Sequence, residues 1–253
     1  MALPPYYSRL GPFRKVFRSG HALLTYHHVG PRPRRARLKG LYISPRLFAR
    51  QLAEWKAEGF CAPGYDSLFA PAASAQQHVF LTFDDGFRDV FDHALPLLRE
   101  YRFRAIEFIV ADLLGKTSEW QARDNDTPGP LMDKAQIDEW LAAGNEIGSH
   151  TLTHPFLTKI SPAKAREEII SSKKKLENLF GQPIRHFCYP YGDWNQAVRD
   201  FVADAGYETA CTTEFGVNPP GADRFALKRI TARYPSRSLK TLRAWVKRRW
   251  SRN

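Results

Sequence analysis

Two adjacent carboxylates, Asp84 and Asp85, are the residues of this sequence whose types and spacing most clearly indicate chemistry. They follow the apolar and β-branched run 79–83 and precede Gly86, which predicts a buried strand that ends in an acidic corner. Neighbouring side chains on a regular strand point to opposite faces, so we expect the strand to end before the pair if both carboxylates share a pocket. Carboxylates held close together repel unless a cation or a proton lies between them. The pair therefore indicates a metal, a shared proton or both, and the alternative is a solvated Asp-Asp-Gly turn.

Two histidines four residues apart, His150 and His154, form the second candidate group. Pro155 disfavours a helical conformation at His154, so we expect a tight loop after a short strand over 146–150. Two imidazoles and one carboxylate make a common divalent metal site that keeps open positions for water and substrate. Taken alone, the histidines could equally be structural or solvent-facing, and the acidic corner elsewhere in the chain favours the metal site.

The elements that must position these groups alternate between strands and helices. The predicted strands are 22–26, 79–83, 105–110, 146–150, 185–189, 208–213 and 225–231, and the predicted helices are 45–58, 87–101, 133–143, 161–180 and 196–205. This alternation predicts parallel strands with crossover helices, and at 253 residues it favours a single barrel over an open sheet. Active sites of such barrels form at the carboxyl ends of the strands. His27, the acidic corner, His150 and the corner 190–192 are therefore expected to meet there.

The formal net charge of +12 is unevenly distributed along the chain. Residues 1–53 and residues 224–253 each contain eleven Lys or Arg and no acidic residue, whereas residues 54–223 hold 16 basic and 26 acidic residues. Such basic ends suit nucleic acid, an anionic membrane surface or an acidic glycan, or they serve solubility and pair with the acidic middle. No nucleic-acid reading motif is present, so we expect no nucleic-acid partner.

Both ends also carry apolar side chains among the basic ones. Residues 6–18 resemble an amphipathic surface segment, and the segment 237–253 is typical of a basic amphipathic helix, which favours contact with an anionic membrane surface. A helix that covers the barrel is the alternative for the second segment. The predicted organisation is a basic aromatic arm over 1–20, one barrel over 21–236 and this C-terminal helix.

Other features limit the class of protein. Cys61, Cys188 and Cys211 are an odd number at wide spacing, which predicts reduced thiols in strands. No apolar run approaches the roughly 20 residues of a bilayer span, and residues 1–20 lack the continuous apolar stretch of a leader. We therefore expect a cytoplasmic protein that can bind peripherally at the inner membrane face.

The sequence resembles the polysaccharide deacetylase family, the NodB-homology domain of carbohydrate esterase family four. The family's first motif, Thr-Phe-Asp-Asp-Gly, stands at 82–86, the second as His150-Thr-Leu-Thr-His154 and the third as Tyr189-Pro-Tyr-Gly192, and the similarity spans roughly 22–230. The resemblance implies an α/β fold with a single distorted, incomplete (β/α) barrel of about seven parallel strands. It also implies a metal-dependent hydrolase that removes an N-acetyl group from an amino sugar.

Residue roles follow from the resemblance position by position. Asp84 resembles the catalytic base, while Asp85, His150 and His154 resemble the ligands of one divalent metal ion. Zinc is the first choice of metal, with cobalt, nickel, iron or manganese as alternatives. The resemblance also gives the backbone N–H of Tyr191 the task of stabilising the oxyanion.

The chain departs from the family pattern at two positions. Cys188 stands where the familiar third motif has an arginine, and the segment 227–230 lacks the histidine acid of the familiar fifth motif. The third-motif wording and the histidines after the first strand resemble the branch that acts on exopolysaccharide and lipid-linked sugars. His27 or His28 is thus a candidate general acid, or else a buried histidine bonded to backbone. Arg229 could bind an acidic substrate group, replace the absent arginine or form a salt bridge.

Pro190 and Trp194 are the remaining candidate substrate contacts. An indole can stack on a sugar ring, although tryptophan is also often a core residue. Cys188 could be a ligand or a nucleophile, but a buried strand position is the simpler interpretation. The expected substrate is an N-acetylated sugar in a cell-surface glycan or in its lipid- or nucleotide-linked precursor. The alternative is a catalytically degenerate glycan-binding module of the same fold.

Overall fold

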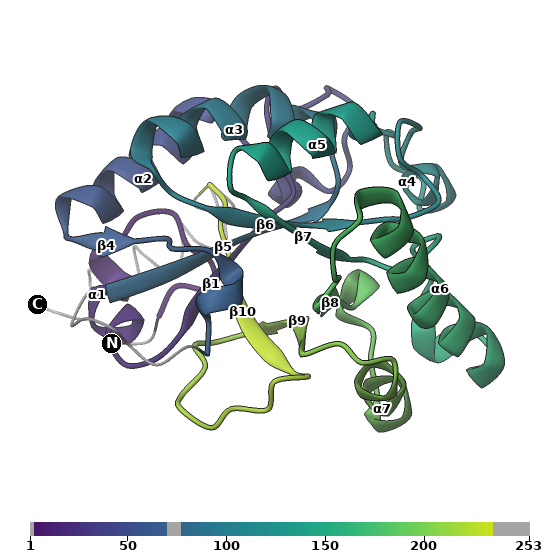
Figure 1. The fold of residues 1–253 in the computed structure, drawn as a ribbon. Helices are drawn as coiled ribbons and strands as arrows, with labels where there is room; N and C mark the ends of the chain where they lie inside the picture. Colours follow the sequence, from purple (N-terminus) through teal and green to yellow (C-terminus); the bar gives the residue numbers. More distant parts are fainter. Residues whose placement is uncertain (1–2, 70–76, 235–253) are drawn as a thin grey trace, which may run out of the picture.

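Seven parallel strands form a closed barrel at the centre of the protein (Figure 1). The computed structural model describes residues 3–69 and 77–234. The strands of the ring, in chain order, are β1 (Ala22–Tyr26), β5 (Gln77–Asp85), β6 (Ala105–Ile109), β7 (Glu146–Ser149), β8 (His186–Cys188), β9 (Thr209–Phe215) and β10 (Leu227–Thr231). Neighbours follow the order β1-β10-β9-β8-β7-β6-β5, and β5 pairs back with β1 to close the ring. The prediction of a single barrel of about seven parallel strands is confirmed, one strand short of the eightfold form.

Helices cover the outside of the barrel and return the chain from one parallel strand to the next. They are α2 (Pro45–Ala57), α3 (Arg88–Tyr101), α5 (Lys134–Ala142), α6 (Pro162–Phe180) and α7 (Gln196–Asp204). Figure 1 shows α2, α3 and α5 along one side of the ring and α6 and α7 along another. All five helices were predicted with ends correct to within one or two residues.

Local signals explain why the helix ends were predictable. The Ser44 side chain accepts the N–H of Leu47 at 3.2 Å at the start of α2, and a proline follows it in the first turn. A reciprocal capping box between Asp133 and Gln136 starts α5. Gly181 ends α6 with a left-handed φ of 64°, a conformation in which a residue without Cβ is favoured. Each signal involves only consecutive residues, so it can be read before the fold is known.

Short elements escaped the sequence prediction. They are the strand pair β2 (His28–Val29) and β3 (Tyr42–Ile43), the strand β4 (Phe60–Cys61) beside β5, and the helices α1 (Arg14–Phe17) and α4 (Glu119–Arg123). Elements of two to five residues are too short to show a periodicity in the sequence. Only their pairing or packing in the folded protein defines them.

The barrel interior changes from apolar to polar along the strands. Side chains alternate along β5, so Phe80, Thr82 and Asp84 face the same side. Phe80 belongs to a buried interior cluster with Leu23, Ile106, Phe108, Cys188, Cys211 and Leu227, and all three cysteines are free thiols, as predicted. Thr82 and Asp84 lie further along and bind the buried Arg229. The packed apolar end leaves the carboxyl end of the barrel for polar groups.

The N-terminal residues are part of the core. Tyr7 is fully buried and its ring stacks on Trp55 of α2 at 5.3 Å between centroids, while Phe13 and Phe17 pack beside it. Backbone hydrogen bonds also join Tyr7 to Thr231 and Arg233, beside β10. The interpretation of 6–18 as an amphipathic surface segment is therefore wrong, because its apolar face packs against the barrel and is not available to a lipid surface. The predicted C-terminal helix over 237–253 lies outside the described residues.

Among the described residues, no helix combines the length and the apolar character that crossing a bilayer requires.

Candidate active site

The acidic corner keeps its place in the sheet. Asp84 pairs with Phe108 and Asp85 with Ile109, so β5 runs through both carboxylates and the expectation that the strand ends before them is wrong. The two side chains nevertheless reach one pocket, because Asp85 has a φ of 84° and Gly86 a φ of 80°. A positive φ at an aspartate is uncommon and turns its carboxylate away from the regular alternation. Backbone strain of this kind is concentrated at functional sites.

Asp85, His150 and His154 form a buried donor cluster. The Oδ1 atom of Asp85 lies 3.3 Å from the Nε2 atom of His150 and 3.3 Å from the Nε2 atom of His154, and one donor atom from each residue lies within 4.8 Å of the others. A tetrahedral zinc ion with bonds of about 2.0–2.1 Å separates its ligand atoms by about 3.3–3.4 Å. The three residues thus match a divalent ion in donor type and in spacing. Their predicted convergence from β5 and from the loop after β7 is found.

The electrostatic environment favours the charge states in which this cluster can bind a cation. Burial alone raises the pKa of the Asp85 carboxyl, but the hydrogen bonds of His150 and His154 and the electrostatic interactions with His154 and His27 outweigh that effect and hold the pKa well below its usual value. Burial lowers the pKa of His154 more than Asp85 raises it. An ionised carboxylate beside a neutral imidazole is the form that binds a metal.

Hydrogen bonds orient the two imidazoles. The Nδ1 atom of His150 donates to the carbonyl oxygen of Cys188 at 2.7 Å, which leaves Nε2 as the acceptor that faces Asp85. The ring of His154 stacks on Trp120 at 4.5 Å between centroids, and its Nδ1 is buried without a hydrogen-bond partner among the described residues. Only the carbonyl contact of His150 is a standard outer-sphere support.

The loop between the histidines has a conformation that a helix would not allow. Thr151 and His154 have φ values of 68° and 63°, which confirms the predicted tight loop. Glu168 of α6 holds this loop: its carboxylate accepts the backbone N–H of Leu152 at 2.9 Å, and the N–H and hydroxyl of Thr153 at 3.0 and 2.8 Å. A buried acid that satisfies three donors fixes the loop and with it the second imidazole.

Asp84 is held by a buried arginine. The Nη1 and Nη2 atoms of Arg229 donate to the two carboxylate oxygens at 2.7 Å each, and the residues are only 2% and 3% exposed. Burial raises the pKa of Asp84, but the charge and hydrogen bonds of Arg229 outweigh it, so the net direction is downward. Arg229 is therefore not placed to bind substrate, which corrects that prediction. The salt bridge expected as an alternative is the one that forms, and Asp84 lies beside His150 of the Asp85 cluster with both of its oxygens bound by Arg229.

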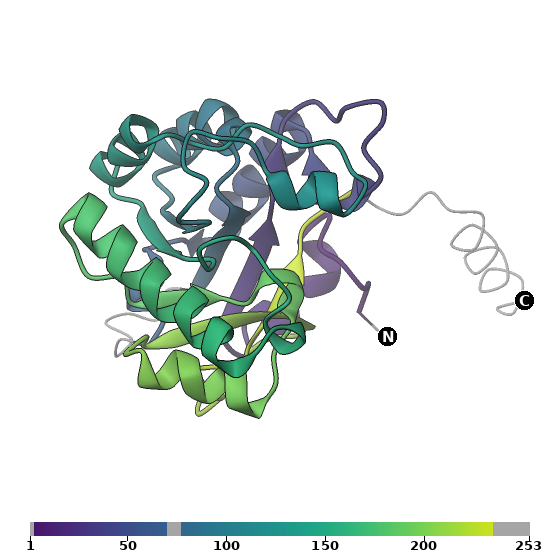
Figure 2. The same cartoon turned by 90° about the vertical axis from the view of Figure 1, so that its right-hand side faces the viewer.

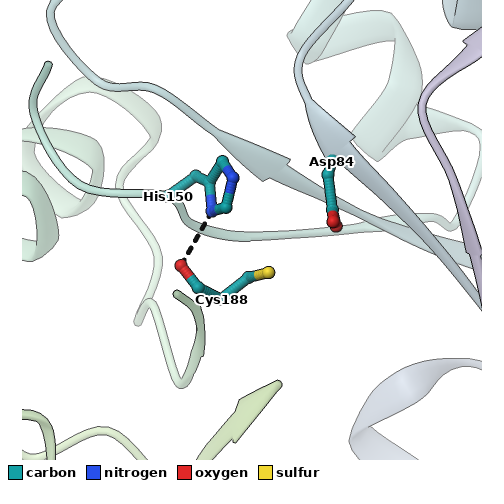
Figure 3. Close-up of side chains that lie close together, drawn as sticks. All are labelled: Asp84, His150 and Cys188. Carbon is teal, nitrogen blue, oxygen red and sulfur yellow. Dashed lines mark hydrogen bonds between the residues drawn. The ribbon is translucent and has the colours of Figure 1, made fainter. Parts of the chain in front are cut away.

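An arginine from another strand lies beside Cys188, the position where the third motif lacks its arginine. The Nη2 atom of Arg229 in β10 is 3.1 Å from the Cys188 Sγ atom. Figure 3 shows the Cys188 sulfur and the Asp84 carboxylate pointing into the same space beside His150. Burial raises the pKa of the thiol well above its usual value, so the sulfur stays protonated. This fits the interpretation of Cys188 as a strand residue.

The structure separates the two candidate acids, His27 and His28. The Nε2 atom of His27 lies 3.8 Å from Oδ2 of Asp84, its Nδ1 is buried without a partner among the described residues, and the side chain is 18% exposed. His28 instead stacks between Tyr42 and Phe87, with centroids 4.0 and 3.6 Å away. His27 thus faces the site, whereas His28 is stacked between two rings and its Nδ1 atom lies 2.8 Å from Oδ2 of Asp89. Burial lowers the pKa of His27 more than the nearby carboxylates raise it, so the free imidazole is neutral.

The third-motif corner lies against the second metal-ligand candidate. Tyr191 has a φ of 60°, its ring contacts His154 at 4.5 Å and stacks on Phe156 at 3.8 Å. Pro190 is buried beside it, and Trp194 is half-buried and stacks loosely on Tyr189 at 6.0 Å. The oxyanion role of Tyr191 and the substrate contacts of Pro190 and Trp194 stay predictions.

Sequence reasoning missed residues of the long loop over 112–130. Trp120 of α4 covers His154, and Asp124 accepts the hydroxyl of Tyr191 at 2.8 Å. The length of the loop indicated that it has a function. The tryptophan within its polar stretch was the signal that could have identified Trp120 as a residue of the site.

Glu107 was also missed, because a single acid in an apolar strand has no motif. Its Oε1 atom accepts the N–H of Gly86 at 2.8 Å, directly below the acidic corner, and its Oε2 is buried without a partner among the described residues. Burial first, and then Asp84 and Asp85, raise the pKa of Glu107 well above its usual value. The acid is therefore neutral and braces the turn without adding a third negative charge.

Comparisons with known proteins agree with this geometry. The chitooligosaccharide deacetylase of Bradyrhizobium sp. (strain ANU 289) is 28% identical over 64% of this chain and 68% of its own length. The poly-beta-1,6-N-acetyl-D-glucosamine N-deacetylase of Staphylococcus epidermidis is 26% identical over 61% of this chain and 54% of its own length. The chain thus spans about half to two thirds of the length of the curated relatives it matches.

Solved structures share the whole fold. The Streptococcus pyogenes deacetylase PplD, in complex with acetate, superposes with a TM-score of 0.73 and 25% identity over 89% of this chain and 97% of its own. IcaB from Ammonifex degensii gives a TM-score of 0.74 at 24% identity over 90% and 97%, which shows the fold. The polysaccharide deacetylase family model matches residues 72–210, more than half of the chain. Since the barrel and the motif residues also lie where that family needs them, the chain belongs to the polysaccharide deacetylase family.

Proposed function

We propose that this protein is a metal-dependent hydrolase that removes an N-acetyl group from an amino sugar of a cell-surface glycan or of its precursor. One observation carries the proposal: Asp85, His150 and His154 form a buried group of donors, while Arg229 binds both carboxylate oxygens of the adjacent Asp84. This arrangement places an ionised carboxylate next to a metal site without using it as a ligand. A base beside a metal-bound water is an arrangement that supports amide hydrolysis.

The residues divide the chemistry between them. When bound by Asp85, His150 and His154, a divalent ion lowers the pKa of a water molecule to about 7 and polarises the amide carbonyl. Asp84 then takes the proton of the attacking water. Arg229 keeps Asp84 ionised and fixes the direction of both of its oxygens. Zinc is our first choice because of the N/O donor set and the 3.3 Å spacing.

The departing amine needs a proton, and His27 is our candidate for supplying it. Its Nε2 lies 3.8 Å from the Asp84 oxygen that Arg229 Nη2 also binds, so a small movement carries a proton from the carboxyl to the imidazole. The lowered pKa of His27 then favours release of that proton to the leaving nitrogen. The backbone N–H of Tyr191 is our candidate for stabilising the oxyanion.

The names of relatives support an acetylated sugar as the substrate. One relative is named for chitooligosaccharide and another for poly-beta-1,6-N-acetyl-D-glucosamine, and the PplD structure contains acetate, the expected second product. The alternative, a degenerate glycan-binding module, is disfavoured because such a module needs neither an ionised base nor its buried arginine. A cytoplasmic location at the inner membrane face stays a prediction from the sequence.

Acetate release from N-acetylchitotetraose and from poly-β-1,6-N-acetylglucosamine oligosaccharides tests the proposal. The zinc-loaded protein should release acetate, and Asp84→Asn should lower kcat/KM by about 10²–10⁴ because it removes the base while zinc binding persists. Asp92→Asn, an exposed acid on α3, is the matched control. Chelation should abolish the activity and added zinc should restore it. Undiminished release by Asp84→Asn would refute the assigned base, and zinc binding without release from any N-acetylated sugar would favour the binding module.

A further inference from the structure

A strongly basic loop follows β2. Residues 31–39 form this basic loop. None of its nine side chains is acidic, and five are cationic: Arg32, Arg34, Arg35, Arg37 and Lys39. All five are exposed. In the described part of the chain, no carboxylate lies within ion-pair distance of any of them. Five like charges on a proline-broken loop repel one another, and the electrostatic interaction of Asp126 with Arg37 offsets only part of that repulsion.

The nearest carboxylate is engaged by the backbone of the basic loop. Asp126 accepts the N–H of Arg37 at 2.7 Å and the N–H of Leu38 at 2.9 Å. These two bonds fasten the loop to the segment that carries α4, and Figure 2 shows the two lying together. The guanidinium groups are left to solvent. The loop is thus anchored by its main chain while its side chains stay available.

This anchoring places the basic loop at the mouth of the active site. The chain enters the loop four residues after His27, whose imidazole lies 3.8 Å from Asp84. It leaves the loop toward Tyr42, which stacks on His28. Asp126, which holds the loop, follows α4, and Trp120 of α4 covers His154. The start of the loop is therefore close in sequence to His27, and its middle is bonded to the segment that follows α4, whose Trp120 covers His154.

We propose that the basic loop binds an oxyanion of the substrate, so that the preferred substrate is an acidic, phosphate- or carboxylate-bearing N-acetyl amino sugar. The inference rests on the proposed N-deacetylase function and specifies its substrate class. Four of the five cations are arginines, whose planar fork matches phosphate and carboxylate oxygens. Arg229, the buried cation first considered for this task, is occupied by Asp84. The cations that remain free to bind a substrate oxyanion are those of the basic loop. The positive field of the loop also attracts an anionic substrate from solution.

Three probes separate the sources of the oxyanion. UDP-N-acetylglucosamine carries phosphate, a hyaluronan tetrasaccharide carries carboxylate beside N-acetylglucosamine, and N-acetylchitotetraose is neutral. Binding of each to the zinc-loaded protein is measured by calorimetry in 50 mM and 500 mM salt, and acetate release is measured in parallel. The test variant is Arg34→Gln/Arg35→Gln/Arg37→Gln. The control variant removes three exposed charges away from the basic loop: Lys56→Gln/Arg102→Gln/Lys174→Gln.

At low salt, at least one acidic probe should bind about tenfold or more tightly than the neutral probe, since one charge-assisted hydrogen bond contributes on that order. The test variant should lose that advantage, and high salt should weaken it. Neutral binding and the control variant should be unchanged. The acidic probe that binds shows whether phosphate or carboxylate is recognised.

Equal affinity for neutral and acidic probes, or equal losses in the test and control variants, would overturn the inference. Absence of acetate release from every probe would count against the N-deacetylase function, while the binding results would still decide the role of the basic loop.

Discussion

Replacing Arg229 by methionine tests whether Asp84 depends on its buried partner. Methionine fills much of the same volume but removes the two 2.7 Å bonds to Asp84 and the 2.9 Å bonds to the hydroxyl of Thr82 and the carbonyl of Thr212. Both members of the pair are almost completely buried, so water cannot replace the lost guanidinium. Removing one partner of such a pair typically costs about 3–5 kcal/mol, because an uncompensated charge remains in the interior.

The chain contains a well-matched control for this substitution. Arg199 also binds both carboxylate oxygens of Asp223, through Nε and Nη2 at 2.7 and 2.8 Å, but their side chains are 23% and 41% exposed. Exposed pairs contribute about 0–1 kcal/mol, since water and salt screen them. Arg199→Met should therefore lower the free energy of unfolding far less than Arg229→Met, although each arginine makes two hydrogen bonds of similar length to its carboxylate.

We would measure urea unfolding to test whether Arg229 and Asp84 are energetically coupled. The variants are Arg229→Met, Arg199→Met, Asp84→Asn and the double variant Arg229→Met/Asp84→Asn. If the pair is coupled, the double variant loses less stability than the sum of the single losses, by about 1–3 kcal/mol. Arg229→Met should also lose acetate release, because the base is no longer fixed in direction. Equal small losses for Arg229→Met and Arg199→Met, with additive double-variant behaviour, would refute the reasoning.

Three further outcomes are expected. Burial, followed by the charge of Asp66, raises the pKa of Glu146 from 4.5 to about 7. The folded state therefore keeps a proton that the unfolded state loses, and the free energy of unfolding falls by up to about 3 kcal/mol as the pH rises from 4.5 through 7. Glu146→Gln should remove this fall when urea unfolding is measured across the pH range, and a variant whose pH profile runs parallel to that of the original protein would contradict the prediction. Glu107→Leu should weaken zinc binding about 10–100-fold in competition titrations, while Glu107→Gln, which still accepts the N–H of Gly86, should not; equal affinities would exclude the bracing role. Tyr191→Phe should change kcat/KM less than about tenfold if only the backbone N–H acts, and a larger loss would assign a role to the hydroxyl.

Much of the metal cluster could be predicted because its residues lie in short segments with local signatures. An apolar run followed by two acids marks the end of β5, and Pro155 after His154 excludes a helix at the second histidine. The parallel alternation then places these segments at one end of a barrel. The turn at Asp85 was less accessible, because its left-handed φ is maintained by neighbours such as Glu107 that no local pattern associates with it.

The partner of Asp84 could not be predicted in the same way. Arg229 is 145 positions away, and they meet because β1 pairs with both β5 and β10, which closes the ring and brings the inward faces of those two strands together. The choice between His27 and His28 has the same origin. Alternate residues of the chain leaving β1 face opposite sides, and only closure of the barrel decides which side contains Asp84.

The sequence by itself determined the alternating elements and the helix ends, since each depends on residues within a few positions of one another, and its motifs selected the candidate metal donors through their resemblance to the family. The tertiary structure alone decided which arginine neutralises the base, which histidine faces it, and that the aromatic N-terminal residues belong to the core. These three features depend on contacts between segments far apart in the chain. The strength of those contacts depends on how deeply the closed barrel buries the residues that make them.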